Sequence, residues 1–410
     1  MKISKYRPEY VHYALRIFRI NQSTIQPFPN HLEVTMKINR RSFLKRTLAA
    51  GSMAVGTGSL VSACSGFRRT DLPDQDLLKP ISAQLDQVGG AILYYASLAP
   101  SGHNAQPWFV RVVKKDEWII GLDPQRRLPE VDPDNREALL SLGAFAENLS
   151  LAAFTYGYKA EMEIIARNPF EQDIIKVALI NTGSIDYPLE RLKRRMTVKQ
   201  GYLPDEIKKE DIRALSEPLK GRLFYFPKGS EHAKCTEEGA IENFRIQVNR
   251  DNAQQELVRW VRLSNKDAER YRDGLTVEGM EIRGFKGWFV RNFINPQDFM
   301  KPSFRKQSID LTAKLARQGG GWLVITSDGQ TVADLIDSGR RFERMALMAR
   351  ERKLAIQPMT QYLEEKEGLQ QIAANHAASV IPQFVLRVGY LKNYPDPVSL
   401  RRPVSWFVRS

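Results

Sequence analysis

Two long apolar stretches with helical spacing constrain the fold of this 410-residue chain more than any other feature. They run from about residue 135 to 156 and from about 332 to 352, and apolar residues that recur at helical spacing predict buried helices. Around each stretch the order of predicted elements is the same: helix, strand, long helix, strand. The sequence therefore predicts an α+β fold made of two fused α/β units that form an internal pseudo-dimer.

The predicted elements divide the chain into two halves, 77–187 and 188–410. In the first half a helix at 77–98 precedes the strands, and Asp132-Pro133-Asp134 caps the long helix. The strands predicted for this half are 108–113, 118–122, 159–166 and 174–181. The second half has predicted strands at 223–226, 322–326 and 383–388, shorter helices near 189, at 204–216 and at 364–375, and a loop at 354–359.

The first 63 residues are typical of a targeting region. Asn39-Arg40-Arg41-Ser42-Phe43-Leu44-Lys45 is a twin-arginine export signature, followed by a weakly apolar stretch that is too short for a stable membrane span. That stretch ends in Leu60-Val61-Ser62-Ala63-Cys64, which resembles a lipobox and predicts lipidation of Cys64. We expect an over-extended start or a leader at 1–35, a signal peptide at 36–63 and a tether at 64–76. The mature chain would then lie on the periplasmic side, anchored to a membrane by its lipid.

Composition excludes several classes of function. The net charge is +14, but residues 1–63 carry ten Lys and Arg against two Asp and Glu, which leaves +6 from Cys64 onward. A nucleic-acid-binding function therefore loses its main support. Two cysteines, Cys64 and Cys235, and three histidines after residue 64 provide no disulfide framework and no metal-ligand spacing. G-x-S-x-G, Walker and G-x-G-x-x-G motifs are also missing from the sequence.

Residues Pro100 to Trp108 form a candidate binding loop with the sequence Pro-Ser-Gly-His-Asn-Ala-Gln-Pro-Trp. The two prolines exclude a helix interior, because proline lacks an N–H and restricts the residue before it. Ser101, Asn104 and Gln106 carry short, directional hydrogen-bonding groups. Such a loop can hold a planar polar heterocycle, and a proline-rich turn without a ligand is the alternative.

A second candidate segment is Arg195-Met196-Thr197-Val198-Lys199. In an extended chain alternate side chains share a face, so Arg195, Thr197 and Lys199 would point the same way. Two cations around a hydroxyl can hold a phosphate. A solvated basic surface is the alternative.

Two further segments are candidate parts of the same site. Arg401-Arg402-Pro403 is a second candidate phosphate clamp, with surface charge as the alternative. The predicted loop at 354–359 would present backbone N–H groups and a small apolar wall through Gln357, Pro358 and Met359, or would be a simple turn.

In this order the motifs resemble those of the nitroreductase flavoprotein superfamily, most closely its Acg-type branch, in which two nitroreductase-like units are fused. The similarity extends from about residue 77 to the end. The segment 100–108 resembles Pro-Ser-x-x-Asn-x-Gln-Pro-Trp, with the histidine that is typical of the branch. The segment 195–199 resembles the Arg-x-Ser-x-Arg/Lys motif for the FMN phosphate. Further resemblance lies in 354–359, with Lys353 in place of the usual glycine, and in 128–136, 273–275 and Arg402.

The resemblance implies FMN as the cofactor. In the superfamily one subunit supplies the phosphate motif and the other supplies the Ser/Asn loop. Here each motif occurs once, in opposite halves, so the resemblance implies one complete FMN site in a monomeric pseudo-dimer. The residues that it assigns to FMN are Ser101, His103, Asn104, Gln106, Arg195, Thr197, Lys199, Gln357, Pro358, Met359 and Arg402.

The insertion at about 230–315 is mostly helical and polar, then aromatic between Phe285 and Phe304. In the Acg-type branch such an insertion is expected to act as a lid over the flavin. Ordinary core packing is one alternative. A membrane-facing patch is another, because Arg283, Lys286 and Arg291 lie among the aromatic residues. The aromatic residues in question are Trp288, Phe289, Phe293, Phe299 and Phe304.

Three functions follow from these predictions. The first is an FMN-dependent oxidoreductase of the cell envelope, in which NAD(P)H or another donor reduces a small acceptor and the flavin carries the chemistry without a catalytic side chain. The second is a protein that sequesters FMN under a closed lid. The third is an envelope lipoprotein with a degenerate, empty site.

Overall fold

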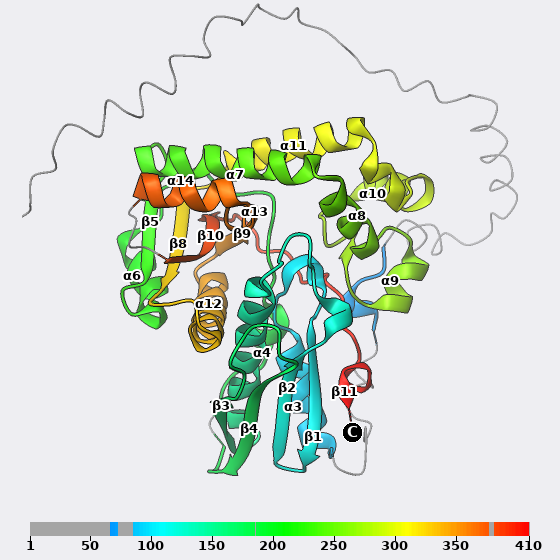
Figure 1. Cartoon of the computed structure of the whole chain (residues 1–410), viewed down its shortest axis with the longest axis vertical. Helices are drawn as coiled ribbons and strands as arrows, with labels where there is room; N and C mark the ends of the chain where they lie inside the picture. Colours follow the sequence, from blue (N-terminus) through cyan, green and yellow to red (C-terminus); the bar gives the residue numbers. More distant parts are fainter. Residues whose placement is uncertain (1–65, 73–84, 185, 377–380, 410) are drawn as a thin grey trace, which may run out of the picture. The chain divides into compact units, whose positions relative to one another are not determined.

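The structure is a computed structural model that describes residues 66–72, 85–184, 186–376 and 381–409. All of these belong to one compact unit, Val61–Ser410. The expected leader, the signal peptide and the lipidation site at Cys64 lie outside the described residues, as does part of the expected tether. Helices and sheets alternate through the described unit, so the α+β fold class is confirmed (Figure 1).

The first of the two main sheets combines the first half of the chain with its C-terminus. Its strand order is β11-β1-β2-β4-β3, and β11 pairs in parallel with β1, with Val408 opposite Val110. The four strands predicted for the first half are confirmed, whereas β11 was not predicted. The bounds are β1 Trp108–Lys114, β2 Glu117–Leu122, β3 Tyr158–Ile164, β4 Asp173–Asn181 and β11 Val408–Arg409.

The second sheet has the strand order β5-β8-β10-β9. The prediction of a loop at 354–359 is wrong, because β9 pairs antiparallel with β10 and Ile356 lies opposite Val388. Leu354, Ala355 and Ile356 are buried in this sheet, and Pro358 ends an edge strand, where a missing N–H is tolerated. The bounds are β5 Leu223–Pro227, β8 Gly321–Ser327, β9 Leu354–Pro358 and β10 Ile381–Tyr390.

The two long predicted helices, α4 (Arg136–Thr155) and α12 (Val332–Glu351), pack against each other between the sheets (Figure 1). Gly143 and Gly339 lie at their crossing. A Cβ on Gly143 would overlap the carbonyl of Ile336, and one on Gly339 would overlap the carbonyl of Leu140. The two helix backbones are therefore in direct contact, which joins the two halves.

Helix caps fix the start of α4 and of α3 (Gln87–Ser97). The Asp132 carboxylate accepts hydrogen bonds from the backbone N–H groups of Glu137 and Ala138 at 3.0 and 2.9 Å, as the cap prediction requires. α3 begins after Asp86, whose Oδ1 accepts the Gly89 N–H at 2.9 Å. The part of the predicted helix at 77–84 lies outside the described residues.

Among the described residues, α4 is the one helix long and apolar enough to cross a membrane, and 83% of its apolar window is buried inside the fold. The shorter helices of the second half are α5 (Glu190–Arg194), α6 (Lys209–Ser216), α13 (Gln361–Glu364) and α14 (Lys366–His376). The helix predicted at 204–216 therefore begins later than expected.

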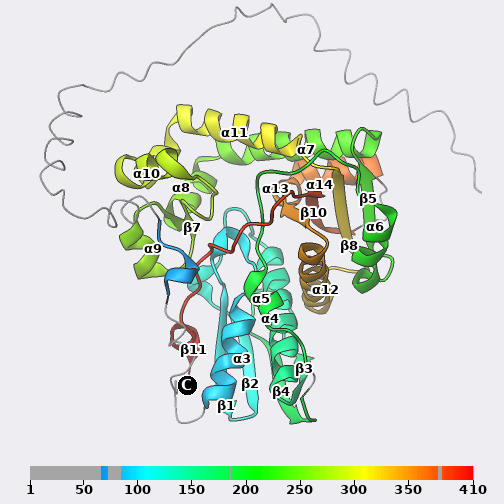
Figure 2. The same cartoon turned by 180° about the vertical axis from the view of Figure 1, so that it is seen from behind.

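The insertion covers two regions of the described unit. α7 packs on β5 and β8 and contacts α11 and α14, so these helices cover the outer face of the second sheet, while α8, α9 and α10 lie at the other end (Figure 2). A short parallel pair, β6 and β7, lies within the region of α8, α9 and α10. The bounds are α7 Glu231–Asn249, α8 Asp251–Trp260, β6 Val261–Arg262, α9 Asn265–Tyr271, β7 Leu275–Thr276, α10 Gly284–Phe293 and α11 Pro302–Ala316.

Candidate functional site

A cavity of about 260 Å³ lies where both halves and the insertion meet. The sequence-predicted residues on its wall are Ser101, His103, Asn104, Arg195, Thr197, Lys199, Gln357 and Pro358. Arg401, which belongs to the candidate clamp at 401–403, also lines it. The wall further contains residues that the sequence did not assign to a site: Glu137, Leu140, Ser141 and Ala144 of α4, Phe342 of α12, Thr360, Phe384, Ser399, and Gly274, Leu275 and Gly279 of the insertion. The two predicted motifs thus reach one cavity from opposite halves of the chain.

The loop at 100–108 has an unusual backbone. His103, Asn104 and Gln106 have φ angles of 50°, 52° and 52°, in the left-handed region that non-glycine residues seldom adopt. The Ser101 Oγ accepts the Gln106 N–H at 2.9 Å and closes the loop on itself. Strained backbone of this kind persists only where neighbouring groups hold it in place.

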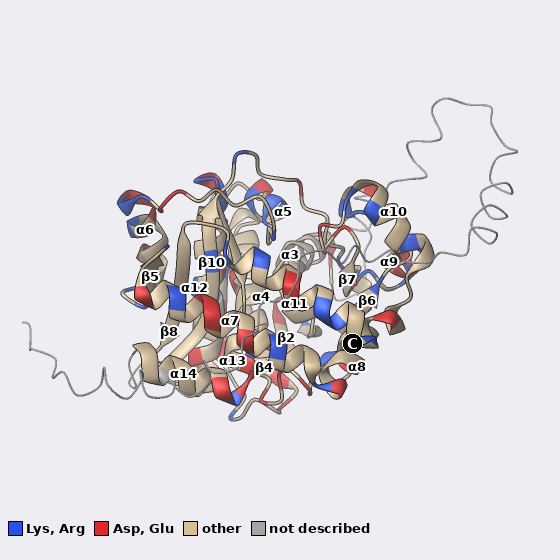
Figure 3. Ribbon diagram, turned by 90° about the horizontal axis from the view of Figure 1, so that it is seen from above, with Lys and Arg blue, Asp and Glu red and all other residues tan. Residues whose placement is uncertain are grey.

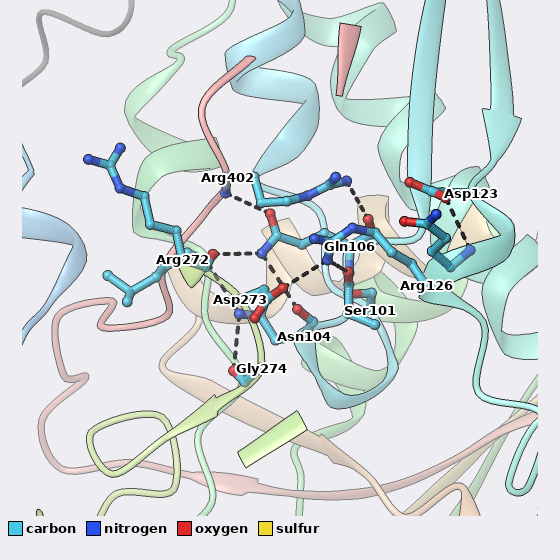
Figure 4. A network of polar contacts seen from close by, with 12 residues as sticks. Ser101, Asn104, Gln106, Asp123, Arg126, Arg272, Asp273, Gly274 and Arg402 are labelled. Carbon is cyan, nitrogen blue, oxygen red and sulfur yellow. Dashed lines mark hydrogen bonds and ion pairs between the residues drawn. The ribbon is translucent and has the colours of Figure 1, made fainter. Parts of the chain in front are cut away.

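The insertion holds this loop from one side (Figure 4). The Asn104 carbonyl accepts the Gly274 N–H at 3.2 Å, and the Asn104 Nδ2 donates to the Gly274 carbonyl at 3.3 Å. Arg126 donates to the Ala105 carbonyl at 2.8 Å and forms an ion pair with buried Asp273 at 2.9 Å. The loop and the segment around Gly274 therefore form one hydrogen-bonded unit.

Gly274 itself tolerates no side chain. Its φ is +72°, and a Cβ would overlap the carbonyl of Trp260. The sequence marked 273–275 only through its resemblance to the Acg-type branch. The contact of Gly274 with the loop at 100–108 is a tertiary contact, which local sequence patterns do not predict.

Gln106 is fully buried and faces away from the cavity, so the structure does not support the prediction that it contacts a ligand. Its Nε2 donates to the Arg272 carbonyl at 2.9 Å, and its Oε1 accepts the Arg402 N–H at 2.9 Å (Figure 4). The Gln106 side chain therefore links the loop at 100–108 to the insertion and to the C-terminal segment by hydrogen bonds.

Arg402 is likewise absent from the cavity wall, which corrects its assignment as a phosphate ligand. Its Nη2 donates to the carbonyls of Gln106 and Trp108 at 2.6 and 2.9 Å. The neighbouring Arg401 lines the cavity instead. Adjacent residues of an extended segment point to opposite sides, so Arg401 faces the cavity while Arg402, the next residue, points away from it.

Arg401 reaches the cavity with its donors already engaged. Its Nε donates to the Ser97 carbonyl at 2.7 Å, and its Nη2 donates to the carbonyls of Leu98 and Ala99 at 3.0 and 3.1 Å, at the end of α3. Its Nη1 donates to Leu400 and to the Asn104 Oδ1 at 2.8 and 3.0 Å. All five guanidinium N–H groups therefore have protein partners.

Arg195 is different, because its buried guanidinium Nε has no hydrogen-bond partner among the described residues. Its closest carboxylate, Glu343, lies 3.4 Å away and is fully buried. Burial raises the pKa of Glu343, an effect that Arg195 opposes. The Nε is the atom that faces Glu343, so Arg195 is a buried cation whose acidic partner is driven toward its neutral form, and such a cation at a cavity wall suits an anionic ligand.

Lys199 adds a second cation to the same wall. Its Nζ donates to the Gly279 carbonyl at 3.0 Å, and its backbone N–H donates to the Glu281 carboxylate at 2.9 Å. Burial lowers the pKa of Lys199, which Glu281 opposes. Thr197 lies between the two cations, so the predicted alternation of Arg195, Thr197 and Lys199 along one face agrees with the cavity wall.

The segment 357–359 is divided between the cavity and the core. Gln357 and Pro358 line the cavity, but Met359 is buried in an apolar cluster with Trp322 and Tyr362, so its assignment to the site is corrected. The turn before β9 contains Lys353 with a φ of 57°. A glycine would adopt this conformation without strain, and the family motif that this segment resembles has a glycine at this position.

Titratable groups at the cavity are shifted toward their neutral forms. Burial, followed by the nearby charge of Lys199, lowers the pKa of His103 to about 4, and the His103 Nδ1 has no hydrogen-bond partner among the described residues. On the α4 side, burial and the charge of Glu137 raise the pKa of Glu364 well above its usual range, and that of Asp132 to about 7. The cavity wall thus combines the basic side chains of Arg195, Lys199 and Arg401 with His103, whose lowered pKa favours the neutral imidazole.

The aromatic residues of the insertion do not line the cavity; Gly274, Leu275 and Gly279 are its only contributions there. The expectation that Trp288, Phe289, Phe293, Phe299 and Phe304 cover the site is therefore not supported. The described residues also contain no group of three His, Cys, Asp or Glu side chains that could hold a metal ion.

Comparison with known proteins gives relatives of one kind. The chain is 23% identical to a protein of Serratia sp. named as the NAD(P)H nitroreductase PigM, over 75% of this chain and 89% of that one. It is 24% identical to a protein of Mycobacterium tuberculosis named as the NAD(P)H nitroreductase Acg, over 75% of this chain and 91% of that one. The chain is thus similar to nitroreductases over most of its length.

Comparisons with family models and with solved structures give weaker similarities or none. No protein-family model matches the chain. A solved structure of a nitroreductase-like family protein from Bacillus cereus aligns at a TM-score of 0.32 and 10% identity, over 56% of this chain and 98% of that one.

Proposed function

We propose that this protein is an FMN-dependent oxidoreductase of the nitroreductase type, which reduces small acceptors with electrons from NAD(P)H. One observation carries the proposal: two motifs from opposite halves of the chain line a single cavity with a cationic wall. The names of the relatives, NAD(P)H nitroreductases that align over 75% of the chain, agree with the reaction and with the donor.

The residues present fit FMN. The guanidinium of Arg195 and the Nζ of Lys199 provide charge for a phosphate, and Thr197 provides a hydroxyl between them. At the loop, the Ser101 hydroxyl has a proton to donate to a planar heterocycle, and the Asn104 amide, held by Gly274, Leu400 and Arg401, forms a fixed polar wall beside it. The unpartnered Nδ1 of His103 is a further buried polar atom that a ligand would satisfy.

Bound FMN would supply hydride transfer, and the protein would bind and orient it. Arg195, Thr197 and Lys199 would hold the phosphate, while Ser101 and Asn104 would fix the ring edge. Gln357 and Pro358 would form a wall of the cavity. Because Arg401 has no N–H to spare, we assign it to holding Asn104 in place through its 3.0 Å hydrogen bond.

A specific observation also favours FMN sequestration with little turnover. The insertion segment at the cavity is tied to both motifs, by Gly274 to Asn104 and by Gly279 to Lys199. A lid held this way restricts access to the cavity. Anaerobic mixing of purified protein with NADPH or NADH separates the two functions, because an oxidoreductase bleaches the flavin absorption and a sequestering protein does not.

The experiment that tests FMN binding is the visible spectrum of the purified full chain, followed by titration of the ligand-free protein with FMN. We expect a yellow protein, and we expect Arg195→Ala and Lys199→Ala each to weaken FMN binding by about 10- to 100-fold. Lys115→Ala is the matched control, since Lys115 is exposed and pairs with Asp86 far from the cavity wall. A colourless protein that takes up no FMN would favour a degenerate site instead.

We further propose that the chain is exported by the twin-arginine route and anchored through Cys64. The sequence Asn39–Lys45 followed by Leu60–Cys64 supports this proposal, and export of folded proteins by this route suits a protein that acquires a cofactor before export. Cys64→Ala should remove the lipid, which mass spectrometry of the membrane fraction would detect. An unmodified Cys64 in the wild type would contradict the anchor.

A further inference from the structure

Helix α10 presents an aromatic surface that the cavity does not use. Phe285 is 74% exposed and Phe293 is 36% exposed, although both are large apolar side chains. Ring contacts join Phe285 to Trp288 and Trp288 to Phe293, each with centroids 5.5 Å apart. We call Phe285, Trp288, Phe289 and Phe293 the α10 aromatic surface.

The inner side of α10 explains why this surface does not turn inward. Val290 and Ile294 pack against the buried cluster of Val261, Leu263 and Val277. Arg291 forms an ion pair with Glu278, and both side chains are less than a tenth exposed. One side of α10 therefore packs against the rest of the protein. The backbone at Gly287 also lies close to the Ile282 carbonyl, since a Cβ at this glycine would be 2.5 Å from the Ile282 oxygen.

The charge around this surface is basic. From Arg283 to Ile294 the sequence contains three basic residues and no acidic one (Figure 3). Arg291 is neutralised by Glu278, whereas Arg283 and Lys286 are exposed. Exposed aromatic side chains next to exposed basic ones are typical of short helices that lie in the surface of an anionic bilayer.

The start of the described chain lies beside the same helix. The Phe67 N–H donates to the Asn265 Oδ1 at 3.2 Å, and a Cβ on Gly66 would overlap the carboxylate of Glu278, the partner of Arg291. Only Ser65 separates Gly66 from Cys64, and two residues span at most about 7 Å of chain. A lipid on Cys64 would therefore be joined to the protein next to α10.

We propose that the α10 aromatic surface docks on an anionic membrane surface. Phe285, Trp288 and Phe293 enter the boundary between headgroups and acyl chains, while Arg283 and Lys286 face the anionic headgroups. This contact complements the proposed lipid on Cys64, because stable anchoring by one covalent lipid needs a second membrane-binding signal. The position of Gly66 beside Glu278 favours a membrane over a second copy of the chain or a peptide.

The test uses the full chain with Cys64→Ala, so that binding does not depend on the lipid. We expect it to float with vesicles that contain phosphatidylglycerol, and to bind vesicles of phosphatidylcholine alone at least about tenfold more weakly. Phe285→Ser with Phe293→Ser should weaken binding at least about tenfold, and Lys286→Glu should weaken it and reduce its salt dependence. The matched control is Phe170→Ser, since Phe170 is a 54% exposed phenylalanine in another part of the fold.

A second readout keeps the proposal independent of vesicle flotation. Brominated lipid should quench the fluorescence of the wild type more than that of Trp288→Phe. Equal flotation of the Cys64→Ala protein with and without Phe285→Ser and Phe293→Ser would overturn the proposal. So would a dimer in light scattering that the double variant abolishes. FMN content measured on the same samples reports the proposed function separately, because none of these residues lines the cavity.

Discussion

The two motifs that line the cavity are held in opposite ways. The loop at 100–108 is tied at almost every polar group: Asn104 and Gln106 each bond both to the insertion and to the C-terminal segment. In the segment at 195–199, Lys199 bonds to Gly279 and Glu281, but the Nε of Arg195 has no hydrogen-bond partner among the described residues and lies 3.4 Å from Glu343. The difference indicates two roles. The loop fixes the shape of the cavity, and the cationic segment keeps binding capacity for a ligand.

Three buried arginines express the same contrast. Arg401 donates to backbone carbonyls of the first half through Nε and Nη2, and Arg402 does so through its Nη2, whereas the Nε of Arg195 lies 3.4 Å from a buried carboxyl whose pKa is raised. An arginine whose donors are engaged stabilises the fold, and removing it leaves buried carbonyls unpaired. Arg195, whose Nε is paired at 3.4 Å with a carboxyl that burial drives toward its neutral form, contributes less to stability until an anion binds. Substitution of Arg402 should therefore lower mainly the stability of the protein, and substitution of Arg195 should lower mainly its affinity for FMN.

The largest expected effect is on stability, at Arg402. Arg402→Met should lower the free energy of unfolding by about 3 kcal/mol, because it leaves the carbonyls of Gln106 and Trp108 without their charged donor in a buried site. Urea denaturation measures the change. Arg409→Met is the control, since Arg409 is 41% exposed and its pair with Asp123 should contribute less than about 1 kcal/mol. Equal losses in the two variants would remove the distinction between tied and exposed arginines.

The next effect is on affinity, at Arg195. Arg195→Met should weaken FMN binding by about 10- to 100-fold while lowering the free energy of unfolding of the ligand-free protein less than Arg402→Met does, because Glu343, whose pKa burial already raises, takes up a proton when its partner is lost. The Arg195 side chain is close to Arg69 and Arg401, so its removal also relieves repulsion between buried cations. Calorimetric titration and urea denaturation measure the two quantities on the same sample. A large loss of stability with unchanged affinity would reverse the roles assigned to the two segments.

The same contrast shows what the sequence can predict. The loop at 100–108, the strand after it and the long helices α4 and α12 follow from local signals: proline restrictions, apolar runs and helical periodicity. The alternation of Arg195, Thr197 and Lys199 needs only an extended backbone. These features depend on neighbours in the sequence, and all of them agree with the structure.

The incorrect predictions concern residues whose positions are determined by tertiary contacts. Arg402 was preferred to Arg401 because nothing local shows which of two adjacent arginines caps α3. Gln357-Pro358 suggested a loop, but pairing with β10 makes 354–358 an edge strand and buries Met359. Gly274 reaches the cavity because it pairs with Asn104, 170 residues away, a contact that no periodicity predicts.

The pH dependence of stability tests the comparison at His103, which belongs to the loop at 100–108 but lies near Lys199 of the cationic segment. Its pKa of about 4 lies below the ordinary value of 6.5, so between pH 6.5 and 4 the unfolded chain binds more protons than the folded one. Stability should therefore fall as the pH falls through this window. His103→Asn, a residue that tolerates the left-handed backbone, should reduce the loss at pH 5.5 by about 1 kcal/mol. Thermal unfolding at pH 7.5 and 5.5 checks the difference, and parallel pH profiles of wild type and variant would contradict it.

The smallest effect concerns the bond that closes the loop on itself. Ser101→Ala removes the hydroxyl that accepts the Gln106 N–H at 2.9 Å, and we expect a loss of about 0.5–1 kcal/mol in the free energy of unfolding. Ser101→Thr keeps the hydroxyl, and the extended backbone at this position, with φ −154° and ψ 155°, accepts a β-branched residue. It should therefore retain the stability of the wild type in urea denaturation. If Ala and Thr are equally stable but both weaken FMN binding, Ser101 acts on the ligand alone, and this part of the loop resembles the cationic segment rather than the tied one.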